Sequence, residues 1–282
     1  MRLGIDSYCY HEYFGEVMPG LEPPLKRSLE DFLEVAGKLK VDGVSLETCF
    51  IPSFQESYLK KIKEIIDQYN MEVVVAWGHP FGFDGGRNKY ALKELNEQYR
   101  TCKIFGADVM RIVGSHEGMR FKPHIPQIKA LSTMLKEAVK VAEENNVKLA
   151  IENHIDYTTE EMLMLIENVD SDYLGINYDT GNVLRMGDHP VESAKVLSKH
   201  IIATHLKDIS PVYGADPKTW NFFASMPVGD GIINIPEVIK VLEEARYPGF
   251  YAVEIDYLHP KYNRELDEAL IKSVDYLRSL KI

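Results

Sequence analysis

The chain has 282 residues, of which 45% are hydrophobic and 27% are charged, and its formal net charge is −11. This length and composition predict a soluble globular protein with a substantial core, and the acidic charge opposes binding to a nucleic-acid backbone. The cysteines at positions 9, 49 and 102 lack the spacing of a disulfide framework or a zinc site, which favours a reducing compartment. No secretory leader and no membrane-spanning run is recognisable, so we expect a cytoplasmic protein.

Eight strand-like segments alternate with eight segments of helical periodicity. The expected strands cover residues 3–10, 43–49, 72–78, 108–114, 148–154, 174–180, 201–207 and 250–256. The expected helices cover residues 28–40, 53–69, 91–106, 127–146, 158–169, 190–200, 235–249 and 263–280. A doubly wound open sheet is the alternative, but a glycine-rich dinucleotide motif is missing. We therefore predict an α/β protein, a (β/α)8 TIM barrel that forms a single domain over residues 1–282.

Two helix starts and one helix end carry capping signals. Ser28 with Asp31, and Ser53 with Glu56, have the three-residue spacing of a capping box. Gly106 follows the helical pattern of residues 91–105 and is a plausible C-terminal cap.

Potential metal ligands close four consecutive strands of this predicted barrel. Glu152 ends the fifth strand in "KLAIENH", Asp179 the sixth in "NYDTGN", His205 the seventh in "THLKD" and Glu254 the eighth in "AVEID". The carboxyl ends of the strands of a barrel meet at its catalytic mouth. Three carboxylates and an imidazole would be costly to bury there unless a cation balanced them. The oxygen and nitrogen donors predict a divalent ion, Mn²⁺ first, with Mg²⁺, Co²⁺ and Zn²⁺ as alternatives.

These motifs, in this order and spacing, resemble the xylose isomerase-like TIM barrels, also called the sugar phosphate isomerase/epimerase family. The resemblance implies that Glu152, Asp179, His205 and Glu254 bind one metal ion, and that the two glutamates also move protons. It implies a metal-dependent sugar isomerase or epimerase that acts by proton transfer next to a carbonyl, with a metal-stabilised enediolate. Glu152 would take the proton and Glu254 would return it. Some epimerases of the family have a histidine where this chain has Asn182.

Two other functions remain open. The first is a metal-dependent lyase or dehydratase of a keto-sugar or keto-cyclitol, including cleavage of 3-oxo-glycosides of the C-glycoside deglycosidase type. The second is a non-catalytic barrel that binds a ligand or partner. The nuclease members of the family use extra histidines, one of them at the position of Asn182, so a nuclease is disfavoured.

Further residues are predicted to contact a sugar or keto-sugar substrate. Lys207 lies two residues after His205 and shares its strand face. Long connections at residues 11–24, 79–90 and 209–231 are rich in aromatic side chains that suit sugar rings or aryl groups. Glu47 and His116 also lie near strand ends, where each is individually expected to be structural. A homo-oligomer or a second subunit is compatible with the sequence. The predicted substrate-binding residues are Lys207, His154, Asn182, Trp77, His79, Arg111 and Trp220.

Overall fold

Eight parallel strands close into a barrel in the computed structural model, which describes residues 1–17 and 21–281. The hydrogen-bonded order is β1-β10-β7-β6-β5-β4-β3-β2. The predicted (β/α)8 architecture is therefore confirmed. The barrel strands are β1 (Leu3–Asp6), β2 (Gly43–Glu47), β3 (Glu72–Ala76), β4 (Val109–Val113), β5 (Lys148–Glu152), β6 (Leu174–Asp179), β7 (Ile201–Leu206) and β10 (Tyr251–Val253).

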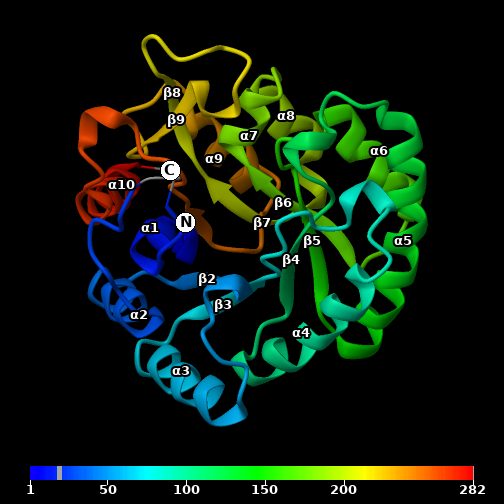
Figure 1. Cartoon of the computed structure of the whole chain (residues 1–282), viewed down its shortest axis with the longest axis horizontal. Helices are drawn as coiled ribbons and strands as arrows, with labels where there is room; N and C mark the ends of the chain where they lie inside the picture. The colour runs from blue at the N-terminus through cyan, green and yellow to red at the C-terminus, as the bar shows by residue number, and fades with distance from the viewer. Residues whose placement is uncertain (18–20, 282) are drawn as a thin grey trace.

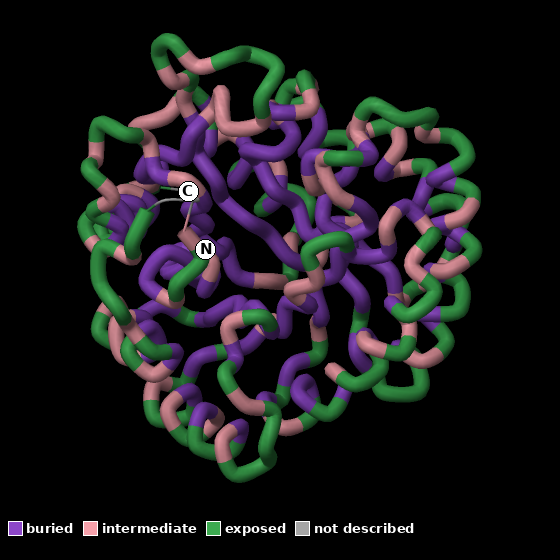
Figure 2. The backbone as a smooth tube through the Cα atoms, in the orientation of Figure 1, coloured by how far each residue is buried: buried purple, intermediate pink, exposed green. Residues whose placement is uncertain are grey.

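Helices surround these strands on the outside, as Figure 1 shows. The strands are covered on both faces, which explains their near-continuous apolar sequences. Figure 2 shows this burial, concentrated along the strands, with exposed residues on the outer helices. The outer helices are α2 (Leu29–Lys38), α3 (Glu56–Gln68), α4 (Ala91–Phe105), α5 (His124–Asn145), α6 (Thr159–Val169), α8 (Pro190–Leu197), α9 (Ile235–Glu244) and α10 (Leu266–Ser279). In the described part of the chain, no helix is long and apolar enough to cross a membrane.

The capping signals are confirmed at two positions and wrong at one. Asp31 N donates to Ser28 Oγ at 3.1 Å, and Ser28 N donates to Asp31 Oδ2 at 2.8 Å, which completes the capping box of α2. Gly106 adopts a φ of 74° directly after α4. The box predicted at Ser53 does not form, because α3 begins at Glu56 and Ser53 Oγ accepts from Gln55 N in a local turn.

The first strand ends four residues earlier than predicted. Asp6 Oδ1 accepts from Tyr8 N at 2.6 Å and turns the chain into a 3₁₀ helix, η1 (Ser7–Tyr10). This turn places Asp6, rather than a later residue, at the carboxyl end of β1. The remaining 3₁₀ helices are η2 (Thr48–Phe50), η3 (Asp84–Gly86), η4 (Glu117–Met119), η5 (Ser198–His200), η6 (Trp220–Phe222) and η7 (Pro260–Tyr262).

The connections at the carboxyl ends of the strands carry additional elements. Short helices follow β1 and β6: α1 (His11–Phe14) and α7 (Thr180–Arg185). The connection after β7 contains an antiparallel hairpin of β8 (Asp208–Pro211) and β9 (Phe223–Met226). Of the long connection predicted at residues 11–24, positions 18–20 lie outside the described residues.

A single carboxylate fastens the base of the connection after β7. Asp208 Oδ2 accepts from the backbone N–H groups of Gly229 at 3.0 Å and Gly231 at 2.9 Å. Its Oδ1 accepts from the backbone of Ile233 at 3.1 Å and of Ile209 at 3.0 Å. The start and the return of this long loop are therefore held together directly beyond β7.

Candidate metal centre

The four predicted metal ligands converge at the carboxyl end of the barrel. Glu152 ends β5, Asp179 ends β6, His205 lies on β7 and Glu254 directly follows β10. One ligand atom from each residue lies within 4.8 Å of those of the other three. All four side chains are buried, with residue exposures between 0% and 4%. The neighbouring positions of these strands in the barrel order explain why residues 102 positions apart share one point in space.

The donor atoms of this cluster fit a divalent cation. His205 Nδ1 lies 2.8 Å from Glu254 Oε2, 3.8 Å from Glu152 Oε2 and 3.9 Å from Asp179 Oδ2. Nδ1 and Glu254 Oε2 are buried, and apart from their ionic contacts with each other and of Glu254 with Lys207, neither makes a hydrogen bond of favourable geometry in the described structure. Buried polar atoms normally have hydrogen-bond partners. Ligand atoms that converge on one point without well-formed hydrogen bonds therefore indicate a binding place for a cation. Three carboxylates and one imidazole form a mixed donor set that suits several divalent metals.

Two asparagines hold the aspartate and a glutamate in position. Asn182 Nδ2 donates to Glu152 Oε1 at 3.1 Å and to Asp179 Oδ2 at 3.0 Å, and its backbone N–H donates to Asp179 Oδ1 at 2.8 Å. Asn153 exchanges two hydrogen bonds of 2.9 Å with the Asp179 backbone. The short helix α7 begins directly after Asp179, which explains why Asn182 points back at the cluster.

A lysine and an arginine balance part of the negative charge. Lys207 Nζ lies 2.9 Å from Asp179 Oδ2, 3.3 Å from Glu254 Oε2 and 3.2 Å from Asp256 Oδ2. Arg185 Nη1 donates to Asp256 Oδ2 at 2.5 Å. Burial opposes the charge of Lys207, but these carboxylates outweigh it and raise its pKa. Lys207 is therefore held as an ammonium beside the ligands, on the strand face predicted from its spacing to His205.

A second arginine bridges two glutamates on the other side of the cavity. Arg111, on β4, donates from Nε to Glu152 Oε2 at 2.5 Å, and its Nη1 lies 3.2 Å from Glu47 Oε1. Burial alone would raise the pKa of Glu152, but Arg111 and His205 hold it well below the usual range. The pKa of Glu254 falls to about 2 because Lys207 and His205 outweigh the effect of burial. Both glutamates are thus ionised at neutral pH.

An aspartate faces the far side of the histidine ligand. Asp6 Oδ2 lies 3.3 Å from His205 Nε2, the ring nitrogen that points away from the other three ligands. Carboxylates in this position commonly fix the orientation of metal-binding histidines. Burial opposes a charge on His205, but Glu254 and Glu152 outweigh it and raise its pKa well above the usual range.

A cavity of about 550 Å³ opens beside the cluster. Its wall includes six of the seven predicted substrate-binding residues: His79, Arg111, His154, Asn182, Lys207 and Trp220. Burial lowers the pKa of His154 to about 4, so its ring is neutral at pH 7. The centres of the Trp220 and Tyr257 rings lie 4.8 Å apart. The Arg185 guanidinium lies 5.3 Å from the centre of the Trp220 ring. The cavity therefore has a charged floor and an aromatic side.

Trp77 is placed differently from its prediction. It is 3% exposed and lies behind the wall, with its ring 5.2 Å from Phe83 and 5.2 Å from His79. The cavity-lining residues include His79 and exclude Trp77. The side chain therefore supports His79 from the core instead of facing the cavity.

Three polar residues of this region, Asp6, Asp256 and Arg185, were not singled out from the sequence, and a fourth, Glu47, was noted at a strand end and expected to be structural. Asp6 and Glu47 end β1 and β2, so the strand-end rule that identified the metal ligands also applies to them. Asp256 follows Glu254 by two residues, the same spacing that relates Lys207 to His205. Arg185 carries no such signal, because its approach to Asp256 depends on the turn made by α7.

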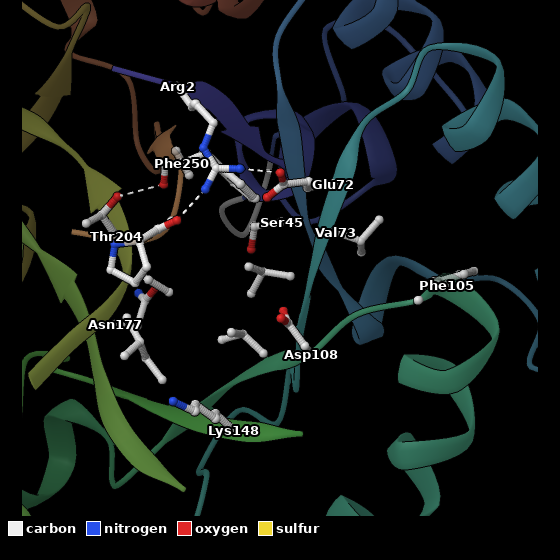
Figure 3. Close-up of a pocket in the computed structure, with 18 of the residues that line it drawn as sticks. Arg2, Ser45, Glu72, Val73, Phe105, Asp108, Lys148, Asn177, Thr204 and Phe250 are labelled. Atoms are coloured by element: carbon white, nitrogen blue, oxygen red, sulfur yellow. Dashed lines mark hydrogen bonds and ion pairs between the residues drawn. The ribbon is translucent and has the colours of Figure 1, made fainter. Parts of the chain in front are cut away.

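A larger cavity, of about 710 Å³, lies at the opposite end of the barrel. Figure 3 shows Arg2 joined to Glu72 at its edge, with Asp108 and Lys148 at the starts of neighbouring strands. Its wall contains none of the four clustered ligands. In TIM barrels the amino-terminal face serves stability, whereas the carboxyl-terminal face carries the chemistry. The smaller cavity is therefore the candidate active site.

Fold and site together define a TIM barrel with a buried cluster of four potential metal ligands at its mouth. A family model described as xylose isomerase-like TIM barrel matches residues 33–280, and the chain belongs to this family. A curated relative, the inosose dehydratase of Clostridium botulinum, is 28% identical over 246 residues, which cover 78% of this chain and 80% of the relative.

Solved structures share the fold over nearly the whole chain. The structure of the IOLI protein with a binding zinc atom has a TM-score of 0.77 and 18% identity, and the match covers 100% of both chains. The structure of an L-ribulose 3-epimerase has a TM-score of 0.72 and 15% identity, and the match covers 98% of this chain and 93% of the neighbour. The predicted family resemblance is confirmed.

Proposed function

We propose that this protein is a metal-dependent dehydratase that removes water from a keto-cyclitol or keto-sugar. The observation that carries the proposal is the buried cluster of Glu152, Asp179, His205 and Glu254, with donor atoms facing one another beside a cavity. The similarity to an inosose dehydratase supports water loss as the outcome. It favours the lyase alternative over the isomerase that the sequence motifs placed first.

The four clustered residues would hold one divalent cation. When bound, such an ion supplies electrostatic stabilisation to negative charge that develops on a carbonyl oxygen. The solved neighbour with zinc supports a divalent ion, whereas the predicted preference for Mn²⁺ gains no support from the comparisons. We therefore propose a divalent ion, and metal analysis of the purified protein would identify the element.

Glu152 and Glu254 are the proposed proton-transfer residues. Both are ionised at neutral pH, as an acceptor of a proton must be; Glu254 lines the cavity, and Glu152 belongs to the cluster beside it. A proton next to a carbonyl is removed by a carboxylate within hydrogen-bond reach, which contributes about 10²- to 10⁴-fold to the rate. We assign proton removal to Glu152, because Arg111 fixes its carboxylate from the cavity wall.

The cavity suits a neutral, hydroxyl-rich ring. Its volume of about 550 Å³ lies in the range of sites for small molecules. Lys207, Arg111 and Asn182 are proposed to orient substrate oxygens at the floor. His154 and His79 are proposed to contact hydroxyl groups at the side, and Trp220 to cover the apolar face of the ring.

An epimerase that shares the first proton transfer is the second candidate. The observation in its favour is the presence of two glutamates, from β5 and from the end of β10, because epimerisation needs a second group to return the proton on the opposite face. The similarity to an L-ribulose 3-epimerase fold is compatible with this reaction.

The deciding experiment follows mass and isotope together. Purified protein is loaded separately with Zn²⁺, Mn²⁺, Co²⁺ and Mg²⁺ and incubated in D₂O with keto-inositols and ketohexoses. Loss of one water from a keto-inositol, dependent on the metal, is the expected result. Deuterium uptake with a changed configuration and no water loss would favour the epimerase. Neither product nor deuterium uptake with any substrate and metal would refute both.

A further inference from the structure

Arg185 is a buried arginine on the wall of the active-site cavity. It is the last residue of α7, its side chain is 2% exposed, and it lines the cavity together with Asn182 and Trp220. A buried charge is costly to the fold unless close partners surround it. The position of this side chain therefore depends on the groups that its guanidinium contacts.

The guanidinium joins three segments of the chain. Nη1 donates to Asp256 Oδ2 at 2.5 Å and Nη2 donates to Asp256 Oδ1 at 3.1 Å, in the segment after β10. Nη2 also donates to the backbone carbonyl of Phe223 at 2.8 Å, at the start of β9. Nη1 donates further to Asn182 Oδ1 at 3.2 Å, within α7. A guanidinium presents its donors in a rigid planar fork, whereas a lysine ammonium is a compact point charge, so this junction needs an arginine.

The contact with Asn182 leads on to the metal ligands. Arg185 donates to the Oδ1 of this amide, and the Nδ2 of the same amide donates to Glu152 Oε1 at 3.1 Å and to Asp179 Oδ2 at 3.0 Å. A side-chain amide has one accepting end and one donating end. A donor held on Oδ1 therefore keeps Nδ2 turned toward the two carboxylates. Arg185 in this way helps to orient two ligands that lie beyond Asn182.

The same guanidinium also holds the aromatic side of the cavity. Its central carbon lies 5.3 Å from the centre of the Trp220 ring, within the range of a cation–π contact. The hydrogen bond to the Phe223 carbonyl fixes the chain three residues after Trp220, where η6 ends and β9 begins. Arg185 therefore contacts both the proposed substrate contact Trp220 and the residue that supports the metal ligands.

We propose that Arg185 is a positioning residue that couples the metal ligands to the aromatic side of the cavity. The proposal rests on the metal site and on the substrate contact of Trp220 proposed above. Through Asn182 the guanidinium orients two of the ligands, and through the Phe223 carbonyl it holds Trp220 at the cavity. Loss of the fork should therefore lower the metal affinity and increase the exposure of Trp220 together.

The other two cations of the cavity wall do not connect these two sides. The Lys207 ammonium contacts three carboxylates at the floor. The Arg111 guanidinium bridges two glutamates. Among the described residues, the side-chain hydrogen bonds and ion pairs of both stay at the floor, whereas those of Arg185 extend to the hairpin of β8 and β9.

The test measures Arg185→Lys without any substrate. The lysine keeps a positive charge beside Asp256, which favours a folded variant, but it loses the fork. Competition with a chromophoric chelator for Zn²⁺ should show an affinity about 10-fold below that of the wild type, the lower end of the usual effect of losing a residue that supports metal ligands. Quenching of tryptophan fluorescence by acrylamide should become stronger. It reports mainly on the half-buried Trp220, because the other tryptophan, Trp77, is 3% exposed.

A double variant tests whether Arg185 acts through Asn182. Asn182→Ala removes the amide, so adding Arg185→Lys to it should lower the metal affinity no further. Arg27→Lys is the matched control, because Arg27 also pairs with a carboxylate, that of Asp267, and lies over two tyrosine rings. Arg27 is outside the set of described residues that line the cavity. The control should leave both the metal affinity and the quenching at the wild-type values.

Three outcomes would overturn the proposal. Wild-type metal affinity in Arg185→Lys would show that the fork does not orient the ligands. Unchanged quenching in the same variant would show that the fork does not hold Trp220. Losses of affinity that multiply in the double variant would show that Arg185 and Asn182 act independently.

These measurements also separate the proposal from the proposed reaction. A wild type that binds Zn²⁺ and gives the expected effects in Arg185→Lys, but removes no water from a keto-inositol, would refute the dehydratase and support the role of Arg185. A wild type that binds neither Zn²⁺ nor another divalent ion would refute the metal site, and the role of Arg185 with it.

Discussion

The two ends of the barrel both contain a cavity with charged residues, and they differ in how those charges are placed. At the amino-terminal end the cavity is larger, about 710 Å³ against about 550 Å³, and the side chains of its Arg2–Glu72 pair are 41% and 57% exposed. At the carboxyl end the side chains of the four clustered ligands are at most 5% exposed. Burial and convergence of charge, rather than the volume of a cavity, therefore distinguish the candidate site.

This difference has an energetic basis. A solvated ion pair costs the fold little and contributes little. Buried charges each carry a desolvation penalty of several kcal/mol, which is repaid only by close partners of opposite charge. The mouth contains the carboxylates of Glu152, Asp179, Glu254 and Asp256 and the cations of Lys207, Arg111 and Arg185, so much of its buried negative charge has a close positive partner. The proposed metal ion would add further positive charge at this end.

The largest expected effect is on turnover at the mouth. Glu152→Gln removes both a ligand and the proposed base, so we predict that turnover of the keto-inositol falls by about 10⁴-fold or more. Steady-state kinetics with saturating metal measures it. A rate within ten-fold of the wild type, in a variant with an unchanged melting curve, would contradict the assignment of chemistry to this end.

The next effect is on the pH dependence of stability. Asp156, which follows β5, is 1% exposed, and burial raises its pKa to about 8. Because the unfolded-state pKa is about 3.9, the folded state binds more protons between these values. The free energy of unfolding is therefore predicted to fall as pH rises, by at most about 1.4 kcal/mol per pH unit.

Asp156→Asn should remove this contribution, because the amide does not titrate and its oxygen can still accept from Tyr157 N. Urea unfolding of both proteins at several pH values between 5 and 7.5 measures the difference, which should grow with pH in favour of the variant. Parallel stability curves would show that the buried carboxyl group is not protonated in the folded state.

A smaller effect is expected at Asn182. Its amide donates to both Glu152 and Asp179, so Asn182→Ala should leave these ligands less well oriented. We predict that metal affinity falls by about 10- to 100-fold, the usual effect of losing such a supporting residue. Competition with a chromophoric chelator measures it without any substrate. An unchanged affinity would show that Asn153 and the backbone suffice to hold Asp179.

The smallest effect is expected at the amino-terminal end. Glu72→Gln removes the exposed ion pair with Arg2 and should change the free energy of unfolding by less than about 1 kcal/mol. Turnover and metal affinity should stay at the wild-type values. A loss of activity would mean that the larger cavity takes part in function, and the contrast between the two ends would have to be abandoned.

The sequence predicted the barrel and the ligand cluster because both depend on local pattern. Alternating periodicity gave the eight units, and the parallel-strand rule placed Glu152, Asp179, His205 and Glu254 together. Asp6 was missed because the first strand was predicted to run past it, whereas its own carboxylate ends the strand. The role of Arg185 depends on its tertiary contact with Asp256, which the spacing of residues in the sequence does not indicate.

The hydrogen bonds that Asp208 accepts hold the base of the loop after β7 in place independently of the tip of that loop. Because one carboxylate fixes both the departure and the return of the loop after β7, the segment between residues 212 and 222 can change in length or sequence while His205 and Lys207 keep their positions. New substrate ranges can thus arise, in evolution or in the laboratory, by exchanging this tip on an unaltered catalytic floor.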